Sequence, residues 1–218
     1  MQYSVADRGG ELFILTNADG AIDFKVVTAP LDSPGRANWR DLIPYREGVY
    51  LIDVELYAGH MVRLERANAL PAIIIRDLET TEEHAIAFDE AAYSLDTQGG
   101  YEFDTTNLRF AYSSMTTPSE VWDYDMASRA RTLRKRQEIP SGHNPADYVT
   151  TRIMATAHDG AQVPVSILHR KDLVRDGNAP LLLYGYGSYG MAMPASFSAN
   201  RLSLVDRGFV YEIGRAHV

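Results

Sequence analysis

Short runs of apolar and β-branched residues, separated by turn-forming residues, occupy the first two-thirds of the chain. Such runs are too short for stable helices, and their β-branched or alternating composition favours strands. Asp19 and Gly20, for example, form a turn signal between two runs at hairpin distance. The pattern predicts strands at residues 11–15, 24–27, 49–54, 61–64, 72–75, 108–112, 120–124 and 133–137.

These runs recur along the chain. A similar beginning is found near residues 11, 60 and 108, which is a repeat of about 50 residues. Four-stranded blades of β-propellers repeat at about 40–50 residues, so the spacing fits consecutive blades. Because the repeats share little identity, the spacing alone leaves a β-sandwich open as the alternative.

The pattern changes near residue 140. Residues 140–147 are rich in proline, glycine and polar residues and predict a linker. Beyond them, runs at 151–157 and 162–168 flank residues 158–160, His-Asp-Gly, and predict a β-hairpin. Pro164 would place the second strand at a sheet edge or at a bulge.

A different order of elements follows the hairpin. Residues 181–184 predict a short buried strand that runs into a glycine-rich loop. A helix is predicted at about 200–206, with Asn200 as its N-cap and Gly208 ending it. Residues 209–211 begin another buried strand. Strand, loop, helix and strand in this order predict the opening of an α/β sheet.

Composition narrows the possible functions. The chain has 218 residues, of which 45% are hydrophobic, and a net charge of −8, so it does not resemble a nucleic-acid binder. It contains no cysteine, which excludes disulfides and cysteine-based zinc sites and suits a reducing compartment. Neither a long apolar run nor a signal-peptide pattern is present. We therefore expect a soluble, cytoplasmic protein without a membrane partner.

One glycine motif spells a dinucleotide-binding fingerprint. Gly185, Gly187 and Gly190 have the required spacing after an apolar strand. The fingerprint also needs a helix that opens at once and an acidic residue ending the next strand. Here residues 191–194 intervene and Asp206 falls in the predicted helix. We therefore expect no cofactor.

The histidines do not predict a metal site. None is four residues from another, and no HExxH motif occurs. We expect each to be solvated or hydrogen-bonded locally. The six are His60, His84, His143, His158, His169 and His217.

Charged runs are interpreted as surface. The basic run at residues 129–136 lacks interleaved aromatic residues, so we expect a solvated strand that pairs with Asp123, Asp125 and Glu138 rather than with nucleic acid. The carboxylates lie in turn-like surroundings and receive no catalytic role. They are Glu82, Glu83, Asp89, Glu90 and Glu102.

Three stretches resemble the oligopeptidase B enzymes of the prolyl oligopeptidase family. Residues 109–125 (RFAYSSMTTPSEVWDYD) are similar to the last propeller blade, and residues 140–149 (PSGHNPADYV) to the crossing into the catalytic domain. Residues 180–190 (PLLLYGYGSYG), with 201–204 and 206–210, resemble the first strands of the α/β-hydrolase fold. The likeness is continuous from about residue 105 to residue 211 and looser upstream.

The resemblance implies a multidomain protein. Residues 1–139 would be a partial β-propeller of antiparallel blades, and residues 140–218 the N-terminal strands of an α/β-hydrolase domain. The implied activity is that of a serine peptidase cutting oligopeptides after Arg or Lys. Its Ser, Asp and His, with the serine in a Gly-x-Ser-x-Gly motif, would follow this chain, which alone is expected to be inactive. The alternatives are a prolyl oligopeptidase proper and a non-catalytic propeller binding module.

One functional residue follows from the resemblance. Tyr186 matches the family's oxyanion-hole tyrosine. Attack on a peptide carbonyl places negative charge on its oxygen, and a phenol, which stays protonated at neutral pH, can donate to that oxygen. Gly185 and Gly187 would let the loop pass close to the substrate. The alternative is that Tyr186 only packs beneath the loop.

Both ends of the chain are expected to be internal to a longer protein, since only about three blades precede the linker. Residues 212–218 depart from the family, in which small apolar residues would follow Tyr211, and a glutamate in a buried strand would be costly. The same residues match the in-frame translation of a sequencing-library adapter. We predict that re-amplifying the locus from source DNA replaces them with other residues. A genuine stop codon after Val218 would contradict this.

Overall fold

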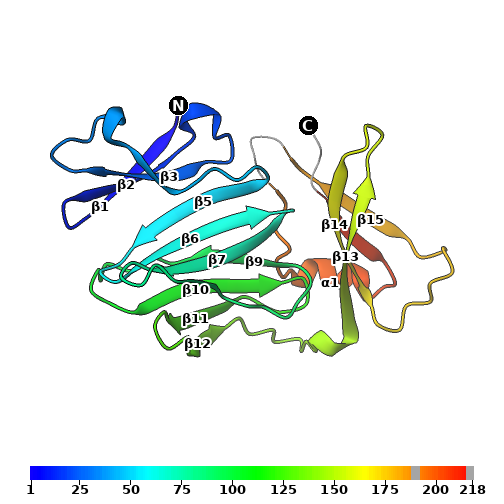
Figure 1. Ribbon diagram of the computed structural model, residues 1–218. Coiled ribbons are helices and arrows are strands. Elements are labelled where there is room, and N and C mark those ends of the chain that lie inside the picture. Colours follow the sequence, from blue (N-terminus) through cyan, green and yellow to red (C-terminus); the bar gives the residue numbers. More distant parts are fainter. Residues whose placement is uncertain (188–191, 215–218) are drawn as a thin grey trace. The chain divides into compact units, whose positions relative to one another are not determined.

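The computed structural model describes residues 1–187 and 192–214 and consists mainly of β-strands (Figure 1). Within those residues the strands form four separate four-stranded sheets. In the first three sheets, strands that follow one another in the chain are neighbours. The fourth sheet has a different order and includes a crossover.

The first three sheets contain strands β1 to β12. The first has the order β1-β2-β3-β4 and the second β5-β6-β7-β8, both with antiparallel neighbours, and the third has the order β12-β11-β10-β9. Their bounds are β1 Tyr3–Arg8, β2 Glu11–Thr16, β3 Lys25–Pro30, β4 Arg40–Ile43, β5 Val49–Leu56, β6 His60–Ala67, β7 Leu70–Asp77, β8 Glu83–Ala85, β9 Tyr93–Thr97, β10 Asn107–Ser114, β11 Glu120–Asp125 and β12 Arg131–Arg136.

The eight strands predicted from the apolar runs are all present. The first three sheets, however, begin one strand before the repeat positions at residues 11, 60 and 108. The runs near residues 11, 60 and 108 begin β2, β6 and β10, the second strand of each sheet. These strands are interior, so they are apolar over most of their length. The four strands that the sequence missed, β1, β4, β8 and β9, all lie at sheet edges, and β1 is largely exposed.

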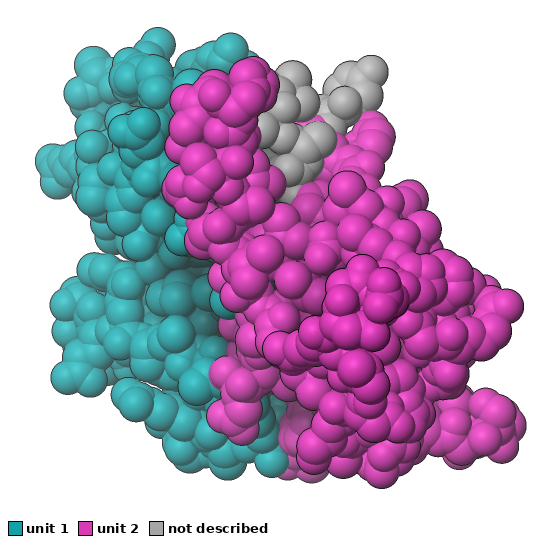
Figure 2. Space-filling model, turned by 90° about the vertical axis from the view of Figure 1, so that its right-hand side faces the viewer, with its two compact units in different colours: residues 1–87, 97–109, 123–131 teal, residues 88–96, 110–122, 132–218 magenta. Residues whose placement is uncertain are grey.

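Two compact units divide the chain (Figure 2). Unit 1 contains residues 1–87, 97–109 and 123–131, and unit 2 contains residues 88–96, 110–122 and 132–218. Parts of the third sheet therefore belong to the same unit as the residues that follow it.

Unit 1 buries β2 on both faces, as an interior strand requires. Phe13 and Leu15 pack in one cluster with Val26, while Ile14 packs in another with Val27. Since successive side chains of a strand point to opposite faces, the two clusters lie on opposite sides of the same sheet.

A buried arginine organises the second sheet. Arg63 on β6 is only 2% exposed, and it donates to Glu65 at 2.9 Å and to both carboxylate oxygens of Glu83 at 2.8 and 2.9 Å. Arg76 donates to Glu83 and Arg46 donates to Glu65. The hydrogen bonds from Arg63 are the main cause that lowers the pKa of Glu83 to about 2. Both charges of the Arg63–Glu83 pair are thus compensated.

The fourth sheet lies in unit 2 and is mixed. Its order is β13-β14-β16-β15. β14 is antiparallel to β13 and β16, whereas β15 and β16 are parallel. The chain reaches β16 from β15 through helix α1, as the predicted strand–loop–helix–strand order requires. The bounds are β13 Tyr148–Thr156, β14 Gln162–Arg170, β15 Leu181–Gly185, α1 Ala199–Val205 and β16 Val210–Gly214.

Two local predictions in this region were wrong. The N-cap of α1 is Ser198, whose hydroxyl accepts from the Arg201 amide, and not Asn200, which lies inside the helix. β14 is an interior strand that pairs without a bulge with β13, although Pro164 predicted an edge or a bulge. In the described residues β16 pairs with Val165 to Leu168, and Pro164 lies opposite Met154 of β13.

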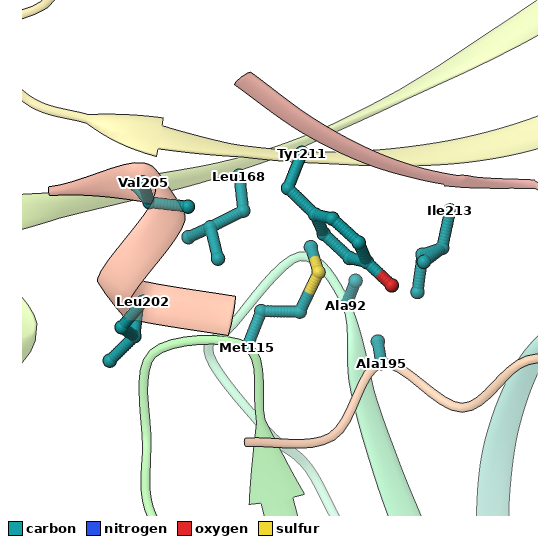
Figure 3. Close-up of a cluster of buried hydrophobic side chains, with 8 residues drawn as sticks. All are labelled: Ala92, Met115, Leu168, Ala195, Leu202, Val205, Tyr211 and Ile213. Atoms are coloured by element: carbon teal, nitrogen blue, oxygen red, sulfur yellow. The ribbon is translucent and has the colours of Figure 1, made fainter. Parts of the chain in front are cut away.

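The core of unit 2 is formed by side chains of the fourth sheet and of α1 together with Ala92, Met115 and Ala195. Figure 3 shows Leu168, Tyr211 and Ile213 extending from the sheet toward Met115 and Ala195. Leu202 and Val205 of α1 and Ala92 complete the cluster. Met115, Leu168 and Val205 are fully buried. Unit 2 is therefore held together by contacts across long sequence separations.

We predict that Arg63→Met destabilises the protein by up to about 3–5 kcal/mol, because it removes the buried guanidinium shared by Glu65 and Glu83 and leaves these carboxylates with Arg46 and Arg76 alone. The measurement is thermal unfolding followed by circular dichroism. Arg109→Met is the matched control, since Arg109 pairs with Asp123 from an exposed position and its loss should change the midpoint little. Equal effects of the two variants would contradict the prediction.

Candidate functional site

Tyr186 follows β15 directly and therefore leaves the sheet at the carboxyl end of a parallel strand. The pairing of β15 with β16 runs from Leu181 opposite Val210 to Gly185 opposite Gly214. Crevices at this end of parallel strands are the usual place for ligands in open α/β sheets. Tyr186 is 40% exposed, so a solute can reach its side chain.

Of the two glycines beside Tyr186, Gly185 has a limited role in packing. A Cβ added to Gly185 would meet the Gly214 carbonyl at 3.6 Å, which is an ordinary contact. Packing within the chain therefore does not require glycine at this position. Gly190, the last glycine of the fingerprint motif, lies outside the described residues, and α1 begins only at Ala199.

The segment after Tyr186 is anchored where it approaches α1. The Phe197 amide donates to the Ser113 hydroxyl at 2.9 Å, and Ala195 is buried in the core of unit 2. Ser198 then caps the helix. Both ends of the segment are thus attached to ordered strands or turns of unit 2.

β15 is exposed, although the sequence predicted a buried strand at residues 181–184. Leu181, Leu182, Leu183 and Tyr184 are 53%, 37%, 63% and 50% exposed. Because successive residues point to opposite faces, both faces of this apolar strand are open to solvent within the described structure. A cavity of about 380 Å³ adjoins the strand, and Leu181, Val210, Ile167, Leu173 and Val174 form much of its apolar lining.

Three histidines form hydrogen bonds, but of these three bonds only that of His169 is local in the sequence as predicted. His84 bonds the Tyr124 hydroxyl at 3.0 Å, and burial lowers its pKa. His143 bonds the Thr116 carbonyl at 2.5 Å, and His169 bonds the Arg170 carbonyl at 2.6 Å.

Two of the histidines are buried rather than solvated: His169 meets the expectation through its local hydrogen bond, whereas His60 does not. His60 and His169 are 7% and 6% exposed. The Nδ1 atom of His60 is buried without a hydrogen-bond partner. His217 lies outside the described residues. Across residues 1–187 and 192–214, no group of three His, Asp or Glu side chains could hold a metal ion.

The basic run forms the exposed strand β12, as expected. Arg136 pairs with Glu120 at 2.7 Å, a partner that the sequence analysis did not name. Asp125 accepts hydrogen bonds from Thr106 and Ser128, which lower its pKa to about 2.

Two of the carboxylates that sequence reasoning left without a role are highly organised. Glu83 pairs with Arg63, and Glu90 accepts hydrogen bonds from four hydroxyl groups. A cluster of Ser and Thr at residues 113–117 was the only local signal for the second arrangement.

Comparison with known proteins identifies a family for the first two-thirds of the chain. Residues 1–137 match the family model described as prolyl oligopeptidase, N-terminal beta-propeller domain. The match favours propeller blades over the β-sandwich that the spacing had left open. In the described residues no helix is long and apolar enough to cross a membrane.

Individual relatives cover nearly the whole chain. Dipeptidyl aminopeptidase BI of Pseudoxanthomonas mexicana is 41% identical over all of this chain and 30% of that protein. Protease 2 of Moraxella lacunata is 27% identical over 96% of this chain and 30% of that protein. Oligopeptidase B of Trypanosoma brucei, with covalently bound antipain, is 32% identical with a TM-score of 0.89 over 98% of this chain and 31% of that one. The chain therefore spans about 30% of the length of these relatives.

We predict that replacing Leu181 and Leu183 together by lysine reduces self-association of the 218-residue chain, because both side chains lie on one open face of an uncovered strand. Light scattering at increasing concentration measures the effect. Leu31→Lys is the control, since Leu31 is 51% exposed in a turn and away from β15. An equal reduction of self-association by the control, or no reduction by the double variant, would contradict the prediction that β15 mediates self-association.

Proposed function

This chain belongs to the prolyl oligopeptidase family, and from that membership we propose that it is part of a longer serine peptidase that hydrolyses oligopeptides. The observation that supports this most directly is the match of residues 1–137 to the family's propeller model, together with relatives that align over nearly the whole chain. The activity belongs to the longer protein, of which this chain spans about 30%.

The proposed domain boundary lies between residues 139 and 140. Residues 1–139 form the propeller blades in this proposal, and residues 140–218 open the α/β-hydrolase domain. Two observations support the boundary. The family model ends at residue 137, and a mixed sheet with a parallel β15–α1–β16 crossover begins at Tyr148.

In the proposed reaction Tyr186 contributes to the oxyanion hole. When a serine hydroxyl attacks the scissile carbonyl, the carbonyl oxygen gains negative charge, and the phenol of Tyr186 donates a hydrogen bond to that oxygen. Its exposure and its place at the carboxyl end of β15 support this role. The nucleophilic serine and its His and Asp partners would lie elsewhere in the longer protein, so the 218-residue chain alone would not cleave peptides.

Two cleavage preferences are in competition. Resemblance to oligopeptidase B favours cleavage after Arg or Lys, and it is supported by the 32% identity and TM-score of 0.89 to the trypanosomal enzyme. The 41% identity to a dipeptidyl aminopeptidase favours release of dipeptides from free N-termini instead. The two differ in one requirement, because only the second needs a free amino group close to the cleaved bond.

We predict that Tyr186→Phe in the full-length protein lowers kcat by about 10²–10³-fold and changes KM little, because it removes a donor used mainly in the transition state. Tyr184→Phe, two residues earlier and 50% exposed, is the matched control and should retain activity. Steady-state hydrolysis of chromogenic peptide amides is the measurement. Normal kcat for Tyr186→Phe would remove this tyrosine from the oxyanion hole.

The same assay separates the cleavage preferences. N-terminally blocked Arg and Lys amides, blocked Pro amides and unblocked dipeptidyl amides are compared with the full-length protein. Hydrolysis of blocked Arg or Lys amides identifies the oligopeptidase activity, and hydrolysis of unblocked dipeptidyl amides alone identifies the aminopeptidase. The 218-residue chain is the negative control, and turnover by a protease-free preparation of it would contradict the proposal.

A further inference from the structure

Strand β13 carries two buried polar atoms that lack partners on one face. The Oγ1 atom of Thr150 and the Nη2 atom of Arg152 are both buried, and neither forms a hydrogen bond in the described structure. Because the two residues are two positions apart on a strand, their side chains leave the sheet on the same face. Buried polar atoms are normally paired, since an unpaired one loses its hydration without compensation. The two atoms therefore mark one place where an interaction is missing.

Strand pairing identifies the face on which they lie. Thr150 lies opposite Leu168, which lies opposite Tyr211, whereas Arg152 lies opposite Ser166. Directly opposed residues of antiparallel strands share a face. Leu168 and Tyr211 extend into the core of unit 2 (Figure 3). Arg152 is thus on the core side of the sheet, and the residue opposite it offers a hydroxyl rather than a carboxylate.

The site opens toward the edge of the sheet. β13 is the first strand in the order of the fourth sheet, so one of its sides has no neighbouring strand within residues 1–187 and 192–214. Met154, the next residue on the same face, is 47% exposed, whereas Thr150 and Arg152 are partly buried. A group from outside the described chain can therefore approach the guanidinium along this edge.

The charge of Arg152 defines the chemistry of the missing partner. A guanidinium has only donors, and a carboxylate, which accepts two parallel hydrogen bonds, is its best match. The buried Arg63 already shows this pairing in the same chain, because it donates to both oxygens of Glu83. The Thr150 hydroxyl is a second donor on the same face. Burial raises the pKa of the Tyr93 phenol and the Arg152 charge opposes that rise, so a third donor is close.

We propose that Arg152, together with Thr150, binds the carboxylate of an Asp or Glu side chain from the part of the longer protein outside these 218 residues. This inference rests on the proposal that the chain is part of a longer protein, and it does not involve Tyr186. The chain spans about 30% of its relatives, so most of the residues that could supply the carboxylate lie outside it. A resident side chain suits the site better than a dissolved anion, because the Nη2 atom is buried and needs a permanent partner.

The first test compares Arg152→Met in the full-length protein and in the 218-residue chain. In the full-length protein the variant leaves the partner carboxylate unpaired, so the midpoint of thermal unfolding should fall by about 4–8 °C. In the 218-residue chain the variant only removes an unpaired charge, so the midpoint should stay or rise. Arg207→Met is the matched control, since Arg207 donates to the Ser203 carbonyl from an exposed position, and it should change both midpoints little.

The second test uses pH to identify a carboxylate. A carboxylate held by an arginine has a lowered pKa in the folded protein, so the stability it contributes is present above about pH 4 and is lost as the pH falls further. The difference in midpoint between wild type and Arg152→Met should therefore shrink as the pH is lowered from 7 to about 3. Arg152→Lys, which keeps the charge, should retain part of the stability. Should Arg152→Met not fold, Thr150→Val replaces it, with a smaller fall expected.

Three results would overturn the proposal. An unchanged midpoint of full-length Arg152→Met means that solvent alone satisfies the guanidinium. An equal fall in both proteins, or a fall that is the same at every pH, means that the side chain only contributes packing. If the midpoint stays but KM rises for peptides with a free C-terminal carboxylate and not for their amides, the carboxylate belongs to the substrate. Because none of these measurements changes Tyr186, the outcome is independent of the oxyanion-hole test.

Discussion

Parallel pairing between β15 and β16 is the constraint on which the candidate site depends. Two parallel strands cannot be joined by a tight turn, so the chain must leave β15, cross through α1 and return to β16. That crossover creates the loop after Gly185 and places Tyr186 at the carboxyl end of the strand. Just before α1, the Phe197 amide donates a hydrogen bond to the Ser113 hydroxyl.

Networks of hydrogen bonds around Arg63 and Glu90 fix the geometry of the neighbouring strands and turns. The buried Arg63 forms a bidentate pair with the partly exposed Glu83 in one sheet, and Glu90 accepts hydrogen bonds from four hydroxyl groups beside the core of unit 2. Burying such groups is costly unless every charge and lone pair finds a partner. Because each is satisfied in only one arrangement of its neighbours, these groups select the geometry of the surrounding turns.

The exposure of β15 is consistent with the chain spanning only about 30% of the length of its relatives. Four consecutive residues of this strand, Leu181 to Tyr184, are exposed although three are leucines. The relatives that match the chain are about three times longer, since it spans about 30% of them. In the proposed longer protein, further elements would cover these apolar faces, which removes a surface that would otherwise associate with other chains.

The amino-acid sequence by itself determined the interior strands, the family resemblance and the choice of Tyr186 as a candidate donor. Interior strands are apolar over most of their length, so local pattern identifies them; the edge strands β1, β4, β8 and β9 are short or polar, and only pairing with a neighbour makes them strands. Likewise, Ser198 rather than Asn200 caps α1, with its hydroxyl accepting the Arg201 amide hydrogen. Glu90 and Ser113 acquire partners from distant parts of the chain, and a sequence pattern carries no signal for contacts that exist only once the chain has folded.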